Sequence, residues 1–327
     1  MDTMQSRGNR LRLATTLAAI AALVILPFLA RSQYQIHMVV VIGMNVILAV
    51  GLNLLMGFTG QINMGQYGFF AIGAYVSAVM STMLHADFWL CMPAAVVVSG
   101  FFGFLVGFPA LRVEGPYLAL VTMGFAESVR IFLNNSDFFG MAMGISGIAA
   151  PRLFVPIDSP IRFYYFILGF LALSVVLNRN MIESSLGRKF RAIRDDPLAA
   201  EVIGISSKRI KILAFCICAS FAGLSGSLYA HYNGYINPSI FSQGIQINFL
   251  LMIVLGGLGR KNGGLIGAVI VTIFYELTRQ FVQYQMIAFG VLMIVVVLFF
   301  NKGITGFIAK FIESREAAAN AEDGRDA

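Results

Sequence analysis

The feature that most constrains this chain is a succession of long apolar stretches with only short polar segments between them. Apolar stretches of about 18 residues or more are typical of membrane-spanning helices. The eighth stretch is shorter than the others and ends in glycines. Ten spans are predicted, near residues 12–30, 36–56, 66–85, 88–110, 116–134, 162–178, 210–232, 245–259, 264–282 and 285–301.

The composition leads to the same fold class. Of 327 residues, 58% are hydrophobic and only 12% are charged, which is too few charges to cover the surface of a soluble protein of this size. We therefore expect an all-α polytopic membrane protein without a soluble domain. Its predicted parts are a cytoplasmic N-terminus at 1–11, a transmembrane region at 12–307 and a cytoplasmic tail at 308–327.

The distribution of Lys and Arg predicts the orientation. If the N-terminus lies in the cytoplasm, 18 of the 23 Lys and Arg residues fall on the cytoplasmic side. This asymmetry agrees with the positive-inside rule, and the opposite orientation violates it. Both termini are thus expected in the cytoplasm. The net charge of +7 is then explained by membrane orientation, and nucleic acid is not expected as a partner.

The first apolar stretch has an alternative interpretation as a signal peptide, because basic residues precede it. Its apolar run is long for that role, and the sequence ARS that follows is a poor cleavage site. A retained first span is the favoured interpretation.

An uncharged polar break separates the second and third spans. Residues 57–75 read GFTGQINMGQYGFFAIGAY and carry no charge, although a cytoplasmic loop is expected to contain Lys or Arg. Irregular backbone at membrane depth is tolerated only where it is buried in protein or lines a water-filled path. We expect Thr59, Gln61, Asn63 and Gln66 to line a translocation pathway or to pack between spans near the cytoplasmic gate. The alternative is a tight glycine turn with incidental amides.

The longest predicted cytoplasmic loop, 184–211, contains the signals of a short helix. Asp195 or Asp196 can cap its N-terminus, and Pro197 suits the first helical position. Gly204 is placed to end the helix in a left-handed conformation. A two-turn helix has no core of its own, so we expect it to pack against something, including another chain. The alternative is a basic loop held against lipid headgroups.

Two Glu-x-x-Arg pairs lie at membrane depth, Glu127 with Arg130 and Glu276 with Arg279. A spacing of three places each pair on one helical face within reach of an ion pair. We expect Glu127 and Arg130 to line a polar outer vestibule. The alternative is that both pairs snorkel toward the outer surface. The largest outer loop, about 135–161, is rich in Gly and Pro and is the expected docking face for an external partner.

No catalytic or cofactor site is expected. The three histidines lack metal-ligand spacing, and the cysteines Cys91, Cys216 and Cys218 lie in apolar stretches where packing is the expected role. The glycine-rich GGLGRKNGG at 256–264 does not have the order of a phosphate-binding loop. The chain is therefore not expected to be an enzyme, and any ATPase that powers it is another polypeptide.

Several stretches resemble one family. GLNLLMGFTGQINMGQYGFFAIGAYVSA, LRVEGPYLALVTMGFAESVRIFLNN, HYNGYINPSIFS and VLGGLGRKNGGLIGAV are similar to blocks of bacterial branched-chain amino-acid ABC transporter permeases of the LivM type. GRKFRAIRDDPLAAEVIGI resembles that family's version of the EAA loop, with Leu198 where the wider consensus has Glu. The resemblance covers about 37–307. NKGITG and GRKNGG depart from the usual family pattern.

The resemblance implies a permease that pairs with a second, homologous permease. It further implies two cytoplasmic ABC ATPases that bind ATP, a periplasmic amino-acid-binding protein that delivers the substrate, and a place in the bacterial inner membrane. The short helix would act as the lever between the ATPases and the spans. The residues expected to couple to the ATPases are Gly187, Arg191, Arg194, Asp195, Asp196, Leu198, Ala199, Ala200, Glu201 and Gly204.

Three alternatives remain at this point. A related permease for urea, short amides or aromatic acids has the same architecture, because specificity resides mainly in the binding protein. An ion-coupled carrier would work without ATP, but it would need charged residues placed for coupling inside the membrane. A non-transporting scaffold would not need the uncharged polar break at 57–66.

Overall fold

The computed structural model describes residues 32–109, 113, 115–152, 157, 159–299 and 303–306. The predicted first span and both predicted terminal segments lie outside the described residues. The described part is built almost entirely from helices, with one pair of two-residue strands.

The helical elements follow the predicted spans closely. Each predicted span after the first coincides with one α-helix, and two further helices lie in the loop at 184–211. The α-helices are α2 (Gln33–Leu52), α3 (Gln66–Met83), α4 (Phe88–Gly107), α5 (Pro116–Asn135), α6 (Pro160–Glu183), α7 (Ser185–Asp195), α8 (Pro197–Val202), α9 (Ser207–Asn233), α10 (Gln243–Gly256), α11 (Gly263–Thr278) and α12 (Val282–Phe299).

Shorter elements connect these helices. A π-helix, Asn53–Phe58, continues α2. The strands β1 (Ile145–Ser146) and β2 (Tyr235–Ile236) pair antiparallel and tie the connection after α5 to the end of α9. Short 3₁₀ turns lie at Asp137–Phe139, Met141–Met143, Pro238–Ile240 and Arg279–Phe281. The region near 135–161, expected to be irregular, consists of turns and this strand pair over its described part.

Five helical segments of the described chain are long and apolar enough to cross a membrane. They are α2 with its π-helical continuation, α4, α5, α6 and α9, and the apolar helices α10 and α11 are shorter. The chain is therefore a multi-pass, all-α membrane protein. The number of ten spans and the orientation stay predictions.

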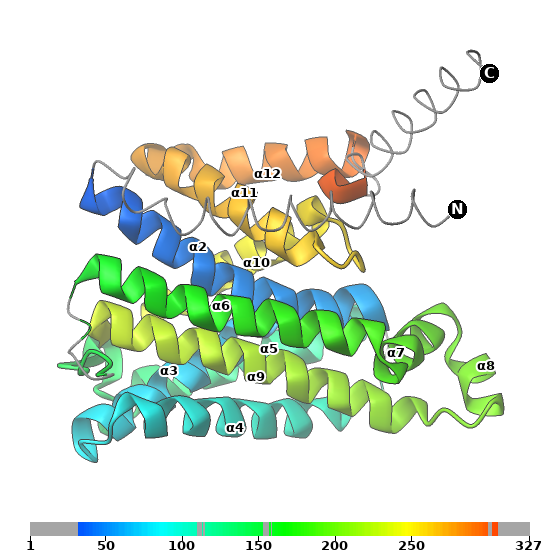
Figure 1. The fold of residues 1–327 in the computed structure, drawn as a ribbon, viewed down its shortest axis with the longest axis horizontal. Coiled ribbons are helices and arrows are strands. Elements are labelled where there is room, and N and C mark those ends of the chain that lie inside the picture. Colours follow the sequence, from blue (N-terminus) through cyan, green and yellow to red (C-terminus); the bar gives the residue numbers. More distant parts are fainter. Residues whose placement is uncertain are drawn as a thin grey trace, which may run out of the picture.

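The spanning helices run side by side along the long axis of the molecule (Figure 1). Helix α9 is central and packs against α3, α4 and α2, while α2 also contacts α6 and α11. Helices α7 and α8 project from one end of the bundle (Figure 1), which we call the α7–α8 end. The opposite end carries the paired strands and is called the β1–β2 end.

Small residues allow the closest contacts of the bundle. A Cβ atom at Gly73 of α3 would lie 2.4 Å from the backbone of Gly223 in α9, and a Cβ atom at Gly223 would lie 2.4 Å from Ser99 Oγ in α4. Lipid tails are as apolar as side chains, so membrane helices associate through close packing of small residues. These glycines fix the distance between α3, α4 and α9.

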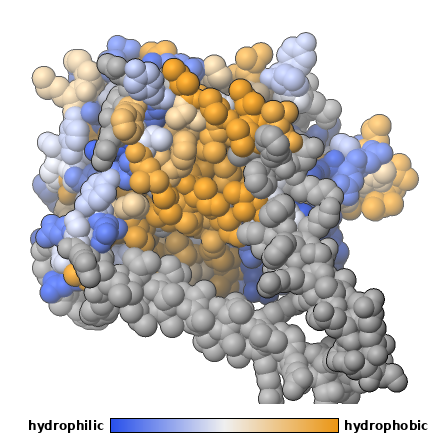
Figure 2. Space-filling view, turned by 90° about the horizontal axis from the view of Figure 1, so that it is seen from above, coloured by the Kyte–Doolittle hydropathy of each residue, from blue (hydrophilic) through white to orange (hydrophobic). Residues whose placement is uncertain are grey.

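The protein presents a broad apolar surface. Figure 2 shows hydrophobic atoms over the middle of one face, with hydrophilic atoms toward its edges. On α12 the exposed side chains include Ile287, Val291, Ile294 and Leu298. An apolar exterior of this kind suits a lipid environment.

Candidate coupling and translocation elements

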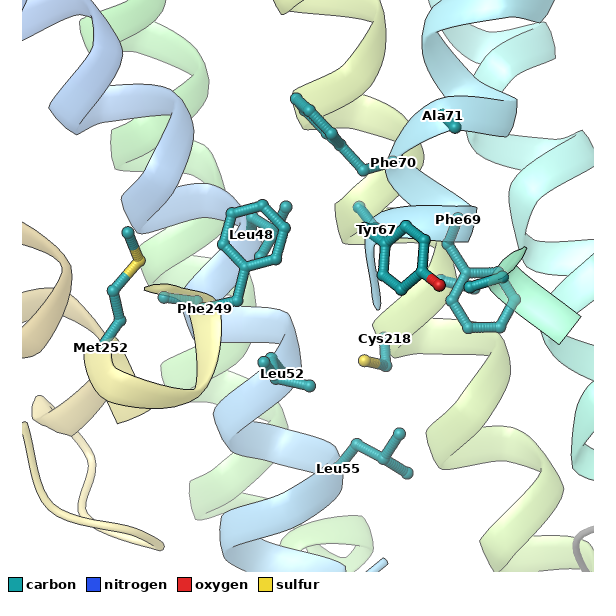
Figure 3. Close-up of a cluster of buried hydrophobic side chains, with 14 of the residues drawn as sticks. Leu48, Leu52, Leu55, Tyr67, Phe69, Phe70, Ala71, Cys218, Phe249 and Met252 are labelled. Carbon is teal, nitrogen blue, oxygen red and sulfur yellow. The ribbon is translucent and has the colours of Figure 1, made fainter. Parts of the chain in front are cut away.

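Helix α3 begins in the interior of the bundle. Its first residue, Gln66, donates through Nε2 to the carbonyl oxygen of Cys218 at 3.4 Å. Cys218 lies eleven residues, or about 16 Å, from the start of α9. Figure 3 shows Tyr67 of α3 beside Cys218, with Leu52 of α2 and Leu55 of the π-helix pointing to the same side. The segment between α2 and α3 therefore returns into the bundle before α3 starts.

The polar side chains of this break bond locally and are buried. Thr59 Oγ1 donates to the Leu55 carbonyl at 2.5 Å, and Gln61 Nε2 donates to the Thr59 carbonyl at 3.5 Å. Asn63 Nδ2 donates to Gln66 Oε1 at 2.9 Å, and the Asn63 side chain also accepts from a backbone N–H two residues later. All four predicted residues are less than a tenth exposed.

Two other helices supply polar side-chain partners that the sequence did not indicate. Thr122 of α5 accepts from the backbone N–H of Met64 at 3.0 Å. Gln246 of α10 accepts from the backbone N–H of Tyr67 at 3.3 Å and donates to the Asn63 carbonyl at 3.2 Å. Backbone groups at membrane depth must find partners inside the protein, and these side chains provide them. We call Asn63, Gln66, Thr122, Cys218 and Gln246 the break cluster.

The pair formed by Glu127 and Arg130 joins this cluster through Tyr67. Arg130 Nε lies 3.0 Å from both carboxylate oxygens of Glu127, and Arg130 Nη2 also donates to Glu127. The Tyr67 hydroxyl donates to Glu127 Oε2 at 3.3 Å. The predicted ion pair is confirmed, with both side chains about one-third exposed. The pathway role of all six predicted residues stays a prediction.

The second pair also forms as the spacing predicted. Arg279 Nη1 donates to Glu276 Oε1 at 3.0 Å, and the Tyr34 hydroxyl donates to the same oxygen. Glu276 is 14% exposed and Arg279 is 62% exposed. This pair lies near the β1–β2 end, because α11 runs from Gly263 toward that end (Figure 1).

The short helix predicted at 197–203 is confirmed as α8. Asp196 is its cap, since its Oδ1 accepts from the backbone N–H of Leu198 at 2.9 Å and of Ala199 at 3.1 Å. Gly204 ends the helix with a left-handed φ of +84°, as expected. Asp195, the alternative cap, is the last residue of α7.

Helix α8 exposes an apolar surface. Leu198 is 75% exposed, Val202 is 87% exposed and Ile203 is 72% exposed. Ala200 faces the opposite way and is buried. The two-turn helix therefore rests on the protein through one small residue and presents large apolar side chains outward.

Helix α7 was not predicted from the sequence. Ser184 caps it by accepting from the backbone N–H of Leu186 at 3.1 Å. Phe190 and Ile193 are fully or nearly fully buried, and a Cβ atom at Gly187 would lie 2.1 Å from the Ile182 carbonyl of α6. The apolar positions 186, 190 and 193 carried the signal, but they are embedded in a basic run. Helix α7 thus packs against the end of α6 and connects it to α8.

The predicted coupling residues fall into two groups. Gly187, Arg191, Arg194 and Asp195 lie on α7, whereas Asp196, Leu198, Ala199, Ala200, Glu201 and Gly204 form or border α8. Of these, Arg194 reaches into the bundle, where its Nη1 donates to the Gly57 carbonyl at 2.5 Å. Their role in ATPase coupling stays a prediction.

Gly57 belongs to the π-helix and is tightly enclosed. A Cβ atom there would lie 2.3 Å from the backbone nitrogen of Gly259 and 2.4 Å from Asn53 Oδ1. Asn53 holds the same connection between α10 and α11, accepting from Gly259 N–H at 3.0 Å and donating to the Arg260 carbonyl at 2.9 Å. Single π-turns are frequent at functional sites. Here one joins α7 to the α10–α11 connection.

The positions of α7 and α8 allow movement to be transmitted to the spanning helices. Among the residues that the structure describes, no group of three or more His, Cys, Asp or Glu side chains is placed to hold a metal ion. Helices α7 and α8 contact the ends of α6 and α9, and Arg194 contacts the end of α2. A displacement of α8 would therefore reach several spanning helices.

Comparison with known proteins places the chain in a family. The profile described as branched-chain amino acid transport system / permease component matches residues 34–299. The high-affinity branched-chain amino acid transport system permease protein LivM of Escherichia coli K12 is 33% identical over 313 residues, covering 88% of this chain and 72% of that protein.

More distant relatives belong to the same kind of system. The permease protein LivH of Escherichia coli K12 is 28% identical over 76% of this chain and 86% of its own length. BraD of Pseudomonas aeruginosa is 28% identical with the same coverage. No solved structure matches the chain. The family profile and the LivM match together show that this chain belongs to the branched-chain amino acid transport system permease components.

Proposed function

We propose that this chain is the transmembrane permease subunit of an ATP-binding-cassette importer that moves branched-chain amino acids into the cell. The family match and the names of the relatives support this function. In this proposal the chain does not hydrolyse ATP, because that step belongs to separate ATPase subunits.

One observation carries the proposal, namely the exposed apolar side of α8. A helix of six residues that exposes Leu198 and Val202 is stabilised when a partner covers these side chains, since burial of each is worth about 1.5–3 kcal/mol. Exposed basic residues surround α8 at this end of the bundle. A cytoplasmic ATPase with an apolar groove fits this surface.

The proposed topology places the α7–α8 end in the cytoplasm and the β1–β2 end outside. The positive-inside rule supports it, because the basic residues cluster at 188–194 and 208–211. In a bacterium the membrane would be the inner membrane. The β1–β2 end would then face a periplasmic amino-acid-binding protein. A second, homologous permease would complete the transmembrane part, in keeping with the existence of both LivM and LivH relatives.

The proposed mechanism is alternating access. Closure of the ATPases would displace α8, and α7 would carry this displacement to α6 through the Gly187 contact and to α2 through Arg194. Packed helices switch between discrete arrangements rather than deforming continuously. In this mechanism the break cluster would be the gate element, since it joins α3, α5, α9 and α10.

The test is reconstitution of this chain with the second permease, the ATPases and the binding protein in proteoliposomes. We expect ATP-dependent uptake of leucine, isoleucine and valine, with ATP hydrolysis stimulated by the loaded binding protein. Stimulation by urea, short amides or aromatic acids instead would assign a related substrate. Uptake that follows an ion gradient and ignores ATP would refute the proposal.

Topology is tested separately with single cysteines and a membrane-impermeant maleimide. A cysteine at Lys189 in α7 should react only from the cytoplasmic side, and one at Tyr235 in β2 only from the outside. The reverse pattern would overturn the proposed orientation.

A further inference from the structure

A cavity of about 560 Å³ is lined mainly by α2, α10 and α11, with further residues from α3, α9 and α12. On α2 it is lined by His37, Val41 and Asn45, which follow one helical face from the beginning of the helix toward its middle. On α11 it is lined from Arg279 back to Val271. The cavity therefore enters from the β1–β2 end and reaches the middle of the bundle.

The size and lining of this cavity suit a small amphipathic ligand. Sites for small molecules are typically about 300–1,000 Å³, mostly apolar, with a few polar groups that fix orientation. Met44, Met252 and Val271 provide apolar walls, whereas Asn45 and Thr272 form a hydrogen bond of 2.9 Å deep inside. An apolar side chain and a polar head can both find partners in this space.

Opposite charges stand together at the mouth. Glu276 and Arg279 both line the cavity and pair through Glu276 Oε1. A guanidinium has five N–H donors, and Arg279 is 62% exposed, so its other donors are open to a carboxylate. Among the described residues no hydrogen bond occupies Glu276 Oε2, which can accept from an ammonium group. An acid and a base one turn apart complement a zwitterion whose charges are also adjacent.

The floor of the cavity adjoins the break cluster. Phe70 of α3 and Phe249 of α10 line the cavity and pack edge to face, with ring centroids 6.0 Å apart. One turn earlier on the same helices, Gln246 bonds to the backbone of Tyr67 and Asn63. The aromatic pair that forms the floor therefore lies one turn from the Gln246 hydrogen bonds. Both contacts join α3 and its preceding segment to α10.

We infer that this cavity is the outer binding site through which the chain accepts its substrate, a zwitterionic amino acid with an apolar side chain. Glu276 and Arg279 bind the charged head at the mouth, the apolar walls hold the side chain, and Phe70 and Phe249 form the closed floor. This inference rests on the proposed function and adds the site to it.

A phospholipid with an ammonium-bearing headgroup shares the same charge chemistry. Such a lipid would place only its headgroup at Glu276 and Arg279, with its acyl chains outside the bundle. A free amino acid is small enough for the cavity of about 560 Å³ and can lie beside the polar pair of Asn45 and Thr272 in its wall. The experiment must therefore separate leucine from lipid.

Asn248 and Ile247 of α10 provide a matched pair of positions. Asn248 lines the cavity, whereas the neighbouring Ile247 does not and is 46% exposed. In the assembled transporter, with Cys91, Cys216 and Cys218 replaced by Ala, Asn248→Cys should react with a polar maleimide. Leucine is delivered by the binding protein, at a concentration about ten times the dissociation constant of the cavity for leucine. It should slow this reaction about tenfold. The reaction of Ile247→Cys should not change.

The lipid arm uses nanodiscs that contain phosphatidylglycerol alone or with phosphatidylethanolamine. Protection of Asn248→Cys should follow leucine and not the lipid. Protection that follows phosphatidylethanolamine and is unaffected by leucine would overturn the inference in favour of a lipid headgroup.

A second readout is uptake by filled-cavity variants. Asn248→Phe should lower the uptake of leucine about tenfold or more, because the larger side chain would occupy the space that the substrate needs. Ile247→Phe should leave uptake within about twofold, since its side chain points away from the cavity. Size-exclusion chromatography and basal ATP hydrolysis confirm that each complex is assembled.

The two levels of the argument fail separately. If the unaltered transporter does not take up leucine, the proposed function fails. If it does take up leucine while Asn248→Cys is not protected and Asn248→Phe transports normally, only the cavity inference fails. If Asn248→Phe does not assemble, the protection experiment alone decides.

Discussion

Arg194 donates a hydrogen bond of 2.5 Å to the carbonyl oxygen of Gly57, which lies 137 positions earlier in the chain. The donor belongs to the helix that leads into α8, and the acceptor belongs to the π-helix at the end of α2. A Cβ atom at Gly259 would lie 2.2 Å from the same guanidinium nitrogen. Arg194 therefore links α7 to the π-helix and to the connection between α10 and α11 at the α7–α8 end.

Arg194→Ala should uncouple ATP hydrolysis from transport. A hydrogen bond to a charged group is worth about 1.5–3 kcal/mol, so its loss should lower leucine uptake about tenfold. ATP hydrolysis stimulated by the binding protein should persist, because the α8 surface is unchanged. The measurement is the number of leucine molecules transported per ATP in proteoliposomes.

Arg188→Ala is the matched control for this variant. Arg188 lies on the same helix, is exposed, and contacts no partner among the described residues. Its variant should keep the transport stoichiometry of the unaltered protein. An equal fall of uptake and ATP hydrolysis in Arg194→Ala would contradict a role in transmission.

Val202→Ser should weaken the association of the ATPases without destabilising this chain. Val202 is 87% exposed, so the isolated permease loses almost no packing when it is replaced. Burial of a Val side chain by a partner is worth about 1.5–3 kcal/mol, and the affinity for the ATPases should fall about tenfold or more. Co-purification and titration of ATPase onto permease-loaded nanodiscs measure this affinity.

Leu84→Ser serves as the control at the opposite end of the bundle. Leu84 is 68% exposed and follows α3 at the β1–β2 end. ATPase affinity should not respond to its replacement. If Val202→Ser binds the ATPases as tightly as the unaltered chain, the proposed docking surface on α8 is wrong.

Local signals explain which parts of this protein were predictable. Asp196, Pro197 and Gly204 act through neighbouring backbone, so the sequence was sufficient to predict α8. Long apolar runs likewise predicted where the helices after the first predicted span lie, while the number of spans stays a prediction. Helix α7 was missed because its apolar positions are few and alternate with basic residues.

Partners distant in sequence could not be predicted. The break at 57–66 indicated buried polar groups, but nothing nearby indicated that Gln246 and Thr122 would satisfy them. The same holds for Gly57 as the partner of Arg194. The cavity is lined by six helices, α2, α3, α9, α10, α11 and α12, whose faces meet only in the folded bundle. Pair spacing predicted the Glu276–Arg279 ion pair, yet not that the pair stands at a cavity mouth.

Gln66→Leu should destabilise the break cluster. Gln66 Oε1 accepts from Asn63 Nδ2 at 2.9 Å and from Cys218 Sγ at 3.1 Å. Replacement by Leu leaves the fully buried Asn63 amide without this acceptor, which costs about 1–3 kcal/mol. The melting temperature of the purified chain in detergent should fall, and Cys218 should become reactive to maleimide.

Cys218→Ala separates the polar contribution from simple packing at this position. It removes the weak thiol donor and the small volume of one sulfur atom but leaves the Asn63–Gln66 hydrogen bond in place, so its melting temperature should fall less than that of Gln66→Leu. Equal losses in both variants would show that the position is governed by volume and not by hydrogen bonding.

Gly73→Ala should loosen the contact between α3 and α9, whereas Gly124→Ala should not harm the protein. A Cβ atom at Gly73 would lie 2.4 Å from the backbone of Gly223, and one at Gly124 meets nothing within 4 Å. Both glycines are interior to helices, where Ala is favoured over Gly by about 0.5–1 kcal/mol. At Gly124 that gain is realised, but at Gly73 the helices must separate, at a cost of about 1–3 kcal/mol. Thermal unfolding in detergent should therefore give opposite shifts for the two variants, and a rise in both would mean that α3 and α9 are not in close contact.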